Sequence, residues 1–317
     1  MFEKILERIK EYPTIIIHRH EKPDGDAIGS QMGLRHIILE AFPDKRVYTV
    51  GDESRFSSLV DGAVMHEIAD DVYNGALAVI LDCGASHLIC DKRYMLAAHS
   101  VRIDHHLYCE KIAHDEVIDS SFESCCGMVA QFAVESGLRI NSEAANALFL
   151  GLVTDTGRFR YDSTDERTFA IASELMKSGV DTSSLYRKLY ADTFESKKLR
   201  AEFTMKIRFT PNGAAYIYTT KQELSELGID AFFASRGMVG VMADTKDVSV
   251  WANFTESDEG ILCELRSDIL SVNPIAVKYG GGGHKKASGA TLDGYETMQA
   301  MLLDLDALAA EAKSVQE

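Results

Sequence analysis

Short β-rich runs and helical stretches alternate through the first 180 residues, and this order limits the fold more strongly than any other feature of the chain. Runs of aliphatic and β-branched residues predict strands over residues 14–17, 46–50, 77–81 and 101–103. Helical periodicity predicts helices over residues 27–40, 124–136, 142–154 and 166–177. Such alternation is typical of an α/β domain, in which helices cover both faces of a parallel sheet.

The pattern changes after residue 180. Short, charged helices are expected over residues 185–190 and 195–205, and strands over 207–209, 214–218, 248–254 and 260–266. We therefore expect three segments. They are an N-terminal α/β domain over residues 1–185, a helical linker over 186–205, and a smaller C-terminal α/β domain over 206–317.

The charge balance limits the partners of this chain. It has 33 Lys and Arg against 49 Asp and Glu, so its formal net charge is −16. This disfavours long nucleic acid, because polyanion binding depends on Lys and Arg that displace counterions. No apolar run approaches the ~20 residues that span a bilayer, so no membrane association is expected. The six cysteines contain no Cys-x-x-Cys pair and no secretory leader is visible, which predicts reduced thiols and a cytoplasmic location.

Acidic and imidazole side chains follow three of the predicted strands, and one more aspartate follows the predicted helix over 142–154. In chain order they are His20, Asp24, Asp26, Asp82, Asp104, His105, His106 and Asp155. An Asp in such a position is usually a helix cap or a turn former, and Asp26 is a candidate N-cap for the helix over 27–40. Open parallel sheets, however, bind ligands at the carboxyl ends of their strands. Four separate segments are therefore expected to deliver these side chains to one edge.

Two histidines and four aspartates of this set are enough for two divalent cations, with Asp82 well placed to bridge them. Two metals about 3.5–4 Å apart can hold a hydroxide between them as nucleophile and bind the phosphoryl oxygens. Four carboxylates balance the charge of two divalent ions; without metal they would repel one another. Mixed imidazole and carboxylate ligands suit Mn²⁺, and Mg²⁺, Co²⁺, Fe²⁺ and Zn²⁺ are also compatible with them.

These motifs resemble those of the DHH phosphoesterase superfamily. The resemblance rests on the triplet Asp104-His105-His106, the loop 20–26, Asp82 and Asp155. It implies that residues 1–185 form the catalytic domain, in which His20, Asp24 and Asp82 hold one metal. Asp26, Asp82, His105 and Asp155 would hold the second, so that Asp82 serves both. His106 would face the substrate phosphate as hydrogen-bond donor or general acid.

A run of four glycines at 280–283, followed by His284, resembles the glycine-rich signature of the DHH-associated substrate-binding domain. Glycines let backbone N–H groups approach an anion closely, although a flexible surface loop is the plainer interpretation. Asn273 is expected to cap a short helix that leads into this run. We predict that Arg266, Gly282, Gly283 and His284 bind substrate, since Arg meets a phosphate bidentately. The next phosphodiester would then lie at the metals.

The favoured function is a manganese-dependent phosphodiesterase, an exoribonuclease that degrades very short RNA to nucleoside 5′-monophosphates. The resemblance implies that it also removes the 3′-phosphate from adenosine 3′,5′-bisphosphate. One alternative is hydrolysis of cyclic di-AMP or of its linear product pApA at the same site. Others are a nucleotide-binding sensor without chemistry, or a structural subunit whose Asp residues only cap helices. The substrate ranking, the direction of cleavage and the oligomeric state, with a homodimer among the options, stay open.

Overall fold

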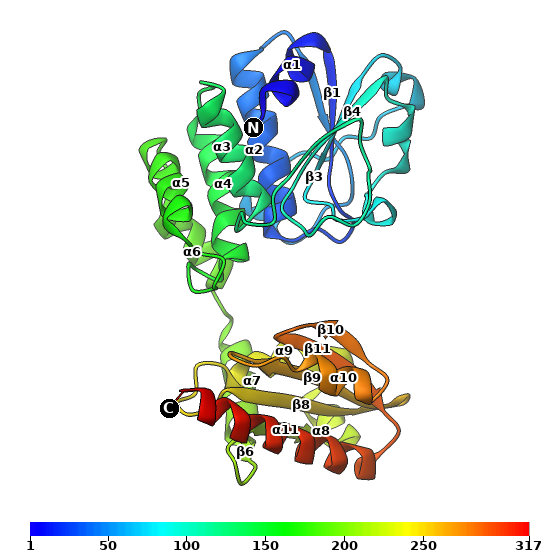
Figure 1. Cartoon of the computed structure of the whole chain (residues 1–317), viewed down its shortest axis with the longest axis vertical. Helices are drawn as coiled ribbons and strands as arrows, with labels where there is room; N and C mark the ends of the chain where they lie inside the picture. The colour runs from blue at the N-terminus through cyan, green and yellow to red at the C-terminus, as the bar shows by residue number, and fades with distance from the viewer. Residues whose placement is uncertain (317) are drawn as a thin grey trace. The chain divides into compact units, whose positions relative to one another are not determined.

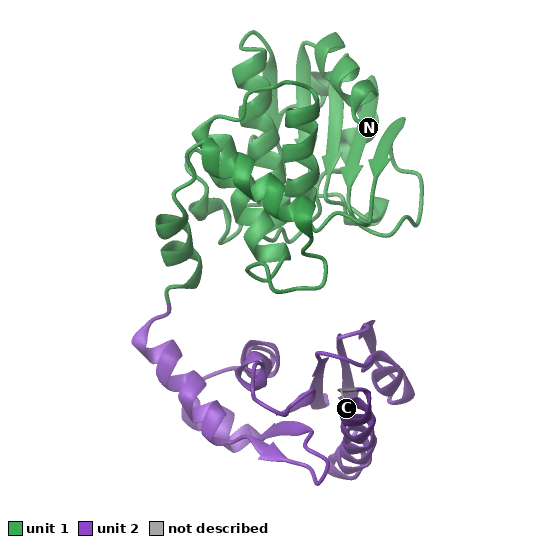
Figure 2. Cartoon of the chain, turned by 60° about the vertical axis from the view of Figure 1, so that its left-hand side comes forward, with its two compact units in different colours: residues 1–191 green, residues 192–317 purple. Residues whose placement is uncertain are grey.

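The computed structural model describes residues 1–316 and divides the chain into two compact units, Met1–Ala191 and Asp192–Glu317 (Figure 2). Each unit has its own sheet and its own hydrophobic core. Within residues 1–316, none of the helices has the length and apolar content of a membrane span.

Unit 1 is built on a parallel sheet of five strands in the order β2-β1-β3-β4-β5. The strands are β1 (Thr14–His18), β2 (Arg46–Thr49), β3 (Leu77–Leu81), β4 (His99–Asp104) and β5 (Asp115–Ile118). Every residue of β1 and β3 is buried, as expected for central strands that are covered on both sides. The parallel α/β sheet was predicted; strand β5 was not, because its half-buried sequence contains no apolar run.

Four α-helices form the main layer on one face of this sheet (Figure 1). They are α1 (Glu3–Glu11), α2 (Gly25–Ala41), α3 (Cys125–Glu135) and α4 (Ser142–Asp155). Outside them, α5 (Glu166–Lys177) and α6 (Thr182–Tyr190) extend the same core. Short 3₁₀ helices lie in the connections between strands β2 and β4: η1 (Ser57–Leu59), η2 (Asp70–Tyr73), η3 (Ser86–Leu88) and η4 (Lys92–Leu96). Helices were expected on the second face of the sheet as well. That face is covered by these 3₁₀ helices, because Tyr73 of η2 and Tyr94 of η4 pack against it.

Close antiparallel packing of α2 on α4 positions the site. A methyl group at Gly29 of α2 would collide with the carbonyl oxygen of Ala147 in α4, so only glycine fits this contact. One helical turn earlier, Gly25 leaves room for Thr154, since a Cβ at position 25 would lie 2.5 Å from the Thr154 hydroxyl oxygen. The amino end of α2 therefore lies beside the carboxyl end of α4, where Asp155 stands.

Unit 2 contains a mixed sheet of six strands in the order β10-β11-β9-β8-β7-β6, in which only the β7–β8 pair is parallel. The strands are β6 (Arg208–Phe209), β7 (Ala215–Thr219), β8 (Val250–Ser257), β9 (Gly260–Ser267), β10 (Gly282–His284) and β11 (Ala287–Leu292). The glycine run thus ends in an edge strand rather than in a free loop.

Helices cover both faces of this second sheet. Along β9, buried residues alternate with half-buried ones, which is the pattern of a strand with two different faces. One face packs on α10 (Asn273–Lys278) and α11 (Tyr295–Gln316). The other packs on α7 (Phe194–Met205), α8 (Lys221–Leu227), α9 (Ala231–Met238) and the 3₁₀ helix η5 (Val239–Met242).

Candidate metal centre

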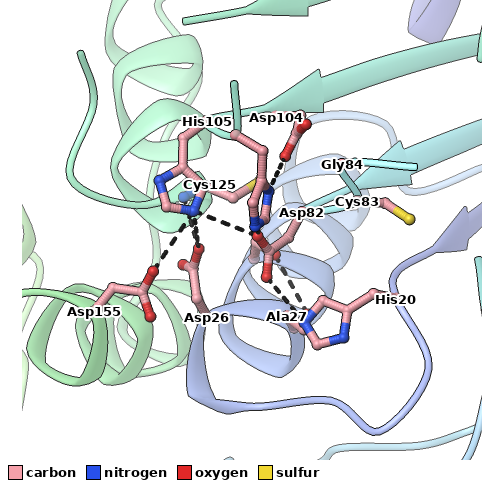
Figure 3. A network of polar contacts seen from close by, with 12 residues as sticks. His20, Asp26, Ala27, Asp82, Cys83, Gly84, Asp104, His105, Cys125 and Asp155 are labelled. Atoms are coloured by element: carbon pink, nitrogen blue, oxygen red, sulfur yellow. Dashed lines mark hydrogen bonds and ion pairs between the residues drawn. The ribbon is translucent and has the colours of Figure 1, made fainter. Parts of the chain in front are cut away.

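The carboxyl ends of β1, β3 and β4 lie next to one another, so the residues that follow them meet at one edge of the sheet (Figure 3). His20 follows β1, Asp82 follows β3 directly, and His105 follows β4 directly. The amino end of α2 adds two further aspartates, and Asp155 comes from the last residue of α4.

The structure brings all six predicted metal ligands together, in two groups. Ligand atoms of His20, Asp24 and Asp82 all lie within 4.8 Å of one another, and the same holds for Asp26, His105 and Asp155. Asp82, a member of the first group, also faces the histidine of the second group. Its Oδ2 lies 3.4 Å from His20 Nε2, and its Oδ1 lies 3.5 Å from His105 Nε2.

Backbone carbonyls orient the two histidines. His20 Nδ1 lies 2.7 Å from the carbonyl oxygen of Glu21, and His105 Nδ1 lies 3.4 Å from that of Phe122. A ring nitrogen that donates to a carbonyl leaves the other nitrogen unprotonated and available as a metal ligand. In both rings the available atom is Nε2, which faces the aspartates (Figure 3).

Asp26 is not the N-cap of α2, contrary to the sequence-based expectation. The helix begins earlier, at Gly25, because Asp24 caps it by accepting hydrogen bonds from the N–H groups of Asp26 and Ala27 at 3.0 Å each. Asp26 therefore lies in the first turn, where its carboxylate is fully buried. It accepts hydrogen bonds from the N–H groups of Cys125 (2.7 Å) and Cys126 (2.8 Å), at the amino end of α3.

The charges of the site fit a pair of cations. Burial raises the pKa of Asp26 to about 7, and it raises that of Asp155 to about 9; the charge of Asp82 contributes to both. Burial lowers the pKa values of His20 and His105, but neighbouring carboxylates outweigh it and raise them to about 11 and about 10. Without metal, the two histidines and Asp155 therefore keep protons at neutral pH. Divalent cations would displace these protons, because metal ligands must be deprotonated.

The backbone at Asp82 is in the left-handed region, with φ of 51°. A non-glycine residue there costs roughly 1–2 kcal/mol, and such strain collects at functional sites where the surroundings impose it. With this backbone conformation, the Asp82 carboxylate at the end of β3 faces both histidines.

His106 lies at the open side of the centre, with its side chain 47% exposed. Its Nδ1 is 2.7 Å from Asp104 Oδ1, so Asp104 orients this ring through the nitrogen that does not face solvent. The other Asp104 oxygen accepts from the fully buried Arg102. Sequence reasoning did not find Arg102, because an arginine inside a strand gives no sign of which carboxylate it meets.

In unit 2 the predicted substrate-binding side chains form one row across the sheet. Ala287 of β11 pairs with Arg266 of β9 on one side and with His284 of β10 on the other. Directly paired residues point to the same face, so Arg266 and His284 flank a small alanine. Gly283, at φ 134°, leaves space for Ser288, whose Cα would be 2.8 Å from an added Cβ.

Two details of unit 2 differ from the expectations. Asn273 does not cap α10; it is the first residue of that helix, and its side chain donates to the carbonyl oxygen of Gly283 at 2.7 Å. Arg236, which carried no sequence signal, lies beside Arg266. Its Nε is 3.1 Å from one oxygen of Glu264, and Arg266 Nη1 is 3.0 Å from the other.

Fold and site together define a two-unit α/β protein with a carboxylate–histidine centre at the edge of a parallel sheet. Comparison with known families agrees with this description. The profile of the DHH family N-terminal domain matches residues 14–152, and that of the DHHA1 domain matches residues 233–311. The chain belongs to the DHH family.

Two of the relatives that are similar over nearly their whole length carry closely similar names. The bifunctional oligoribonuclease and PAP phosphatase NrnA of Bacillus subtilis is 33% identical over 314 residues, covering 98% of this chain and 99% of the relative. The probable bifunctional oligoribonuclease and PAP phosphatase NrnA of Streptococcus mutans is 37% identical over 296 residues, covering 91% and 93%. The crystal structure of an exopolyphosphatase-related protein from Bacteroides fragilis superposes with a TM-score of 0.82 at 26% identity, covering 97% of each chain.

Proposed function

We propose that this chain is a metal-dependent phosphoesterase that degrades very short oligoribonucleotides to nucleoside 5′-monophosphates and removes the 3′-phosphate of adenosine 3′,5′-bisphosphate. The observation that carries this proposal is that Asp82, a member of one His/Asp group, also faces the histidine of the second group in one centre. The names of the relatives from Bacillus subtilis and Streptococcus mutans favour the same pair of activities.

Unit 1 would be the catalytic unit. His20, Asp24 and Asp82 would hold one divalent cation, and Asp26, His105 and Asp155, together with Asp82, the second. Such cations activate water as a nucleophile and offset phosphate charge. We propose Mn²⁺ as the resident ion, because this donor set combines imidazoles with carboxylates.

Two further features of the centre do not depend on the identity of the ion. Asp26 is held rigidly by two N–H groups of α3, so its carboxylate keeps its place. His106, positioned by Asp104, would donate a hydrogen bond to the substrate phosphate or a proton to the leaving oxygen.

Unit 2 would bind the terminal phosphate of the substrate. Arg266 and His284 offer two donors on one face of the sheet, and Gly282 and Gly283 keep the backbone beside them free of side chains. This acidic chain has no surplus of positive charge for a long strand, so short substrates are favoured. The six free cysteines are in keeping with a cytoplasmic location.

Turnover by the purified full chain tests the proposal. The protein is stripped of metal and supplied with Mn²⁺, Mg²⁺ or Co²⁺ in turn. Each form is then given RNA of two to five nucleotides, adenosine 3′,5′-bisphosphate and linear pApA. We expect 5′-monophosphates from the RNA and inorganic phosphate from the bisphosphate, with Mn²⁺ the best of the three. Tight nucleotide binding without product under all three metals would instead indicate a sensor.

A further inference from the structure

A cluster of one arginine and three tyrosines lies close to the metal centre and has no part in the assignments above. We name it the Arg–Tyr platform; its members are Arg158, Tyr161, Tyr186 and Tyr190. The first two belong to the turn after α4 and the other two to α6, which lies beside that turn (Figure 1). The guanidinium carbon of Arg158 is 5.0 Å from the ring centre of Tyr190, and the rings of Tyr186 and Tyr190 are 5.7 Å apart.

The turn that carries the platform is held in an unusual conformation. Gly157, Arg158 and Phe159 have successive φ values of 54°, 68° and 63°, and two of the three are not glycine. Phe159 anchors the turn, because its ring packs on Phe149 at 6.1 Å and on Phe169 at 5.5 Å between ring centres. With Phe159 directed inward, Arg158 is left on the surface.

The ring of Tyr161 lies directly on the backbone of Gly157, so closely that any Cβ at position 157 would collide with it. The side chain is nevertheless 60% exposed, which leaves the outer face of the ring free. Gly157 is two residues from Asp155, so their Cα atoms are at most about 7.6 Å apart. The exposed ring is therefore within reach of a nucleotide attached to a phosphate at the metal centre.

Exposed aromatic rings next to an arginine are the usual means of holding single-stranded nucleic acid. Bases stack on the rings whatever their sequence, and the guanidinium pairs with phosphate or stacks as well. Arg158 is three residues after Asp155 of the metal centre in a chain of net charge −16, so its positive charge is suited to offset repulsion of the substrate backbone.

We propose that the Arg–Tyr platform binds the second nucleotide of a short oligoribonucleotide, the one beyond the scissile phosphodiester. Its base would stack on Tyr161. This inference rests on the proposed function, which assigns the terminal phosphate to Arg266 and His284 of unit 2. Adenosine 3′,5′-bisphosphate has no second base, so the platform would contribute to RNA hydrolysis and not to removal of the 3′-phosphate.

Substrate comparison in Tyr161→Ala tests the platform. Stacking of one base is worth roughly 1–3 kcal/mol, so KM for an RNA dinucleotide should rise about 5- to 150-fold. The kcat/KM for adenosine 3′,5′-bisphosphate should stay within about twofold of the wild type. Tyr161→Phe keeps the ring and should restore the wild-type KM. Tyr295→Ala, at a similarly exposed tyrosine of unit 2, is the matched control and should change neither substrate.

Two results would overturn the inference: an unchanged KM for the dinucleotide, or an equal loss for both substrates, which would indicate general damage to the centre. Binding of a fluorescent RNA dinucleotide is measured beside turnover. A wild type that binds but hydrolyses neither substrate would refute the proposed function. In that event, an about 5- to 150-fold weaker Kd in Tyr161→Ala would still support the platform, and an unchanged Kd would refute it.

Discussion

His106 Nδ1 lies 2.7 Å from Asp104 Oδ1, and this contact ties the exposed histidine of the centre to a fully buried carboxylate. The hydrogen bond that His106 Nδ1 donates to Asp104 raises the pKa of His106, with the charges of Asp104 and Asp82 acting in the same direction. Asp104 itself is held by Arg102, so the ring has a fixed orientation as well as a favoured charge.

Replacing this carboxylate should change the pH profile. Asp104→Asn keeps the shape but removes the charge, so the pKa of His106 should fall. If His106 acts in its protonated form, the alkaline limb of kcat against pH then moves to lower pH. We expect kcat at pH 8 to drop about 10- to 100-fold, as for other positioning partners. Asp71→Asn, at an exposed aspartate of η2 that is not part of the metal centre, is the control. Equal pH profiles in both variants would contradict the role of Asp104 in positioning His106.

Loss of Asp82 should remove both cations at once. Asp82→Asn is the suitable variant, because asparagine tolerates the left-handed backbone that alanine does not, and the fold should persist. We expect turnover to fall by more than about 1,000-fold, and bound metal per chain to fall for both ions. Metal analysis after dialysis checks this. A variant that keeps one tightly bound ion and most of its activity would show that Asp82 does not bridge.

The packing of α2 on α4 should be sensitive to one methyl group. In Gly29→Ala the added Cβ meets the backbone of α4, and overpacking of this kind costs about 1–3 kcal/mol. Gly237→Ala in α9 is the matched control, since its new methyl group meets only the Phe233 ring at 3.5 Å. Helix propensity should make the control neutral or slightly stabilising. Urea unfolding measures both, and equal stabilities would disprove the close contact.

The parallel sheet of unit 1 and the meeting of the predicted ligand residues at its edge could be predicted because both depend on local pattern. Asp82 directly follows the apolar run of β3, whereas His105 follows β4, in which only Val101 and Ile103 are apolar; neighbouring parallel strands end at one edge. The support beneath the ligands could not be predicted. The N–H groups of Cys125 and Cys126 meet Asp26 across about a hundred residues, a contact that depends on tertiary packing alone.

Elements whose sequence has no apolar pattern could not be predicted either. Strand β5 pairs with β4 through its backbone, and its side chains are only half buried. The 3₁₀ helices η2 and η4 are too short for a helical period to appear. Arg236 was missed because the Glu264 that binds it belongs to a different element.

Unit 1 should lose stability below pH 6.5 through His18. Burial lowers the pKa of this histidine to about 4, and neither ring nitrogen has a hydrogen-bond partner among the described residues. Between pH 6.5 and 4 the unfolded chain takes up a proton that the folded chain refuses, so stability falls as pH falls, by about 3 kcal/mol in all. The metal-free His18→Asn variant should lack this component. If the difference in unfolding free energy between wild type and variant is the same at pH 7.5 and pH 4.5, the assignment is wrong.

Arg266 should govern substrate affinity rather than the chemical step, since it lies in unit 2 and the predicted ligands all lie in unit 1. Arg266→Ala should raise KM about 10-fold or more for substrates with a terminal phosphate and leave kcat within about threefold. Arg266→Lys keeps the charge but loses the bidentate fork, so its KM should fall between those of the alanine variant and the wild type. The matched control is Arg208→Ala, an exposed arginine in β6 at the opposite edge of the same sheet. An unchanged KM in Arg266→Ala, or an equal change in the control, would show that the phosphate is held elsewhere.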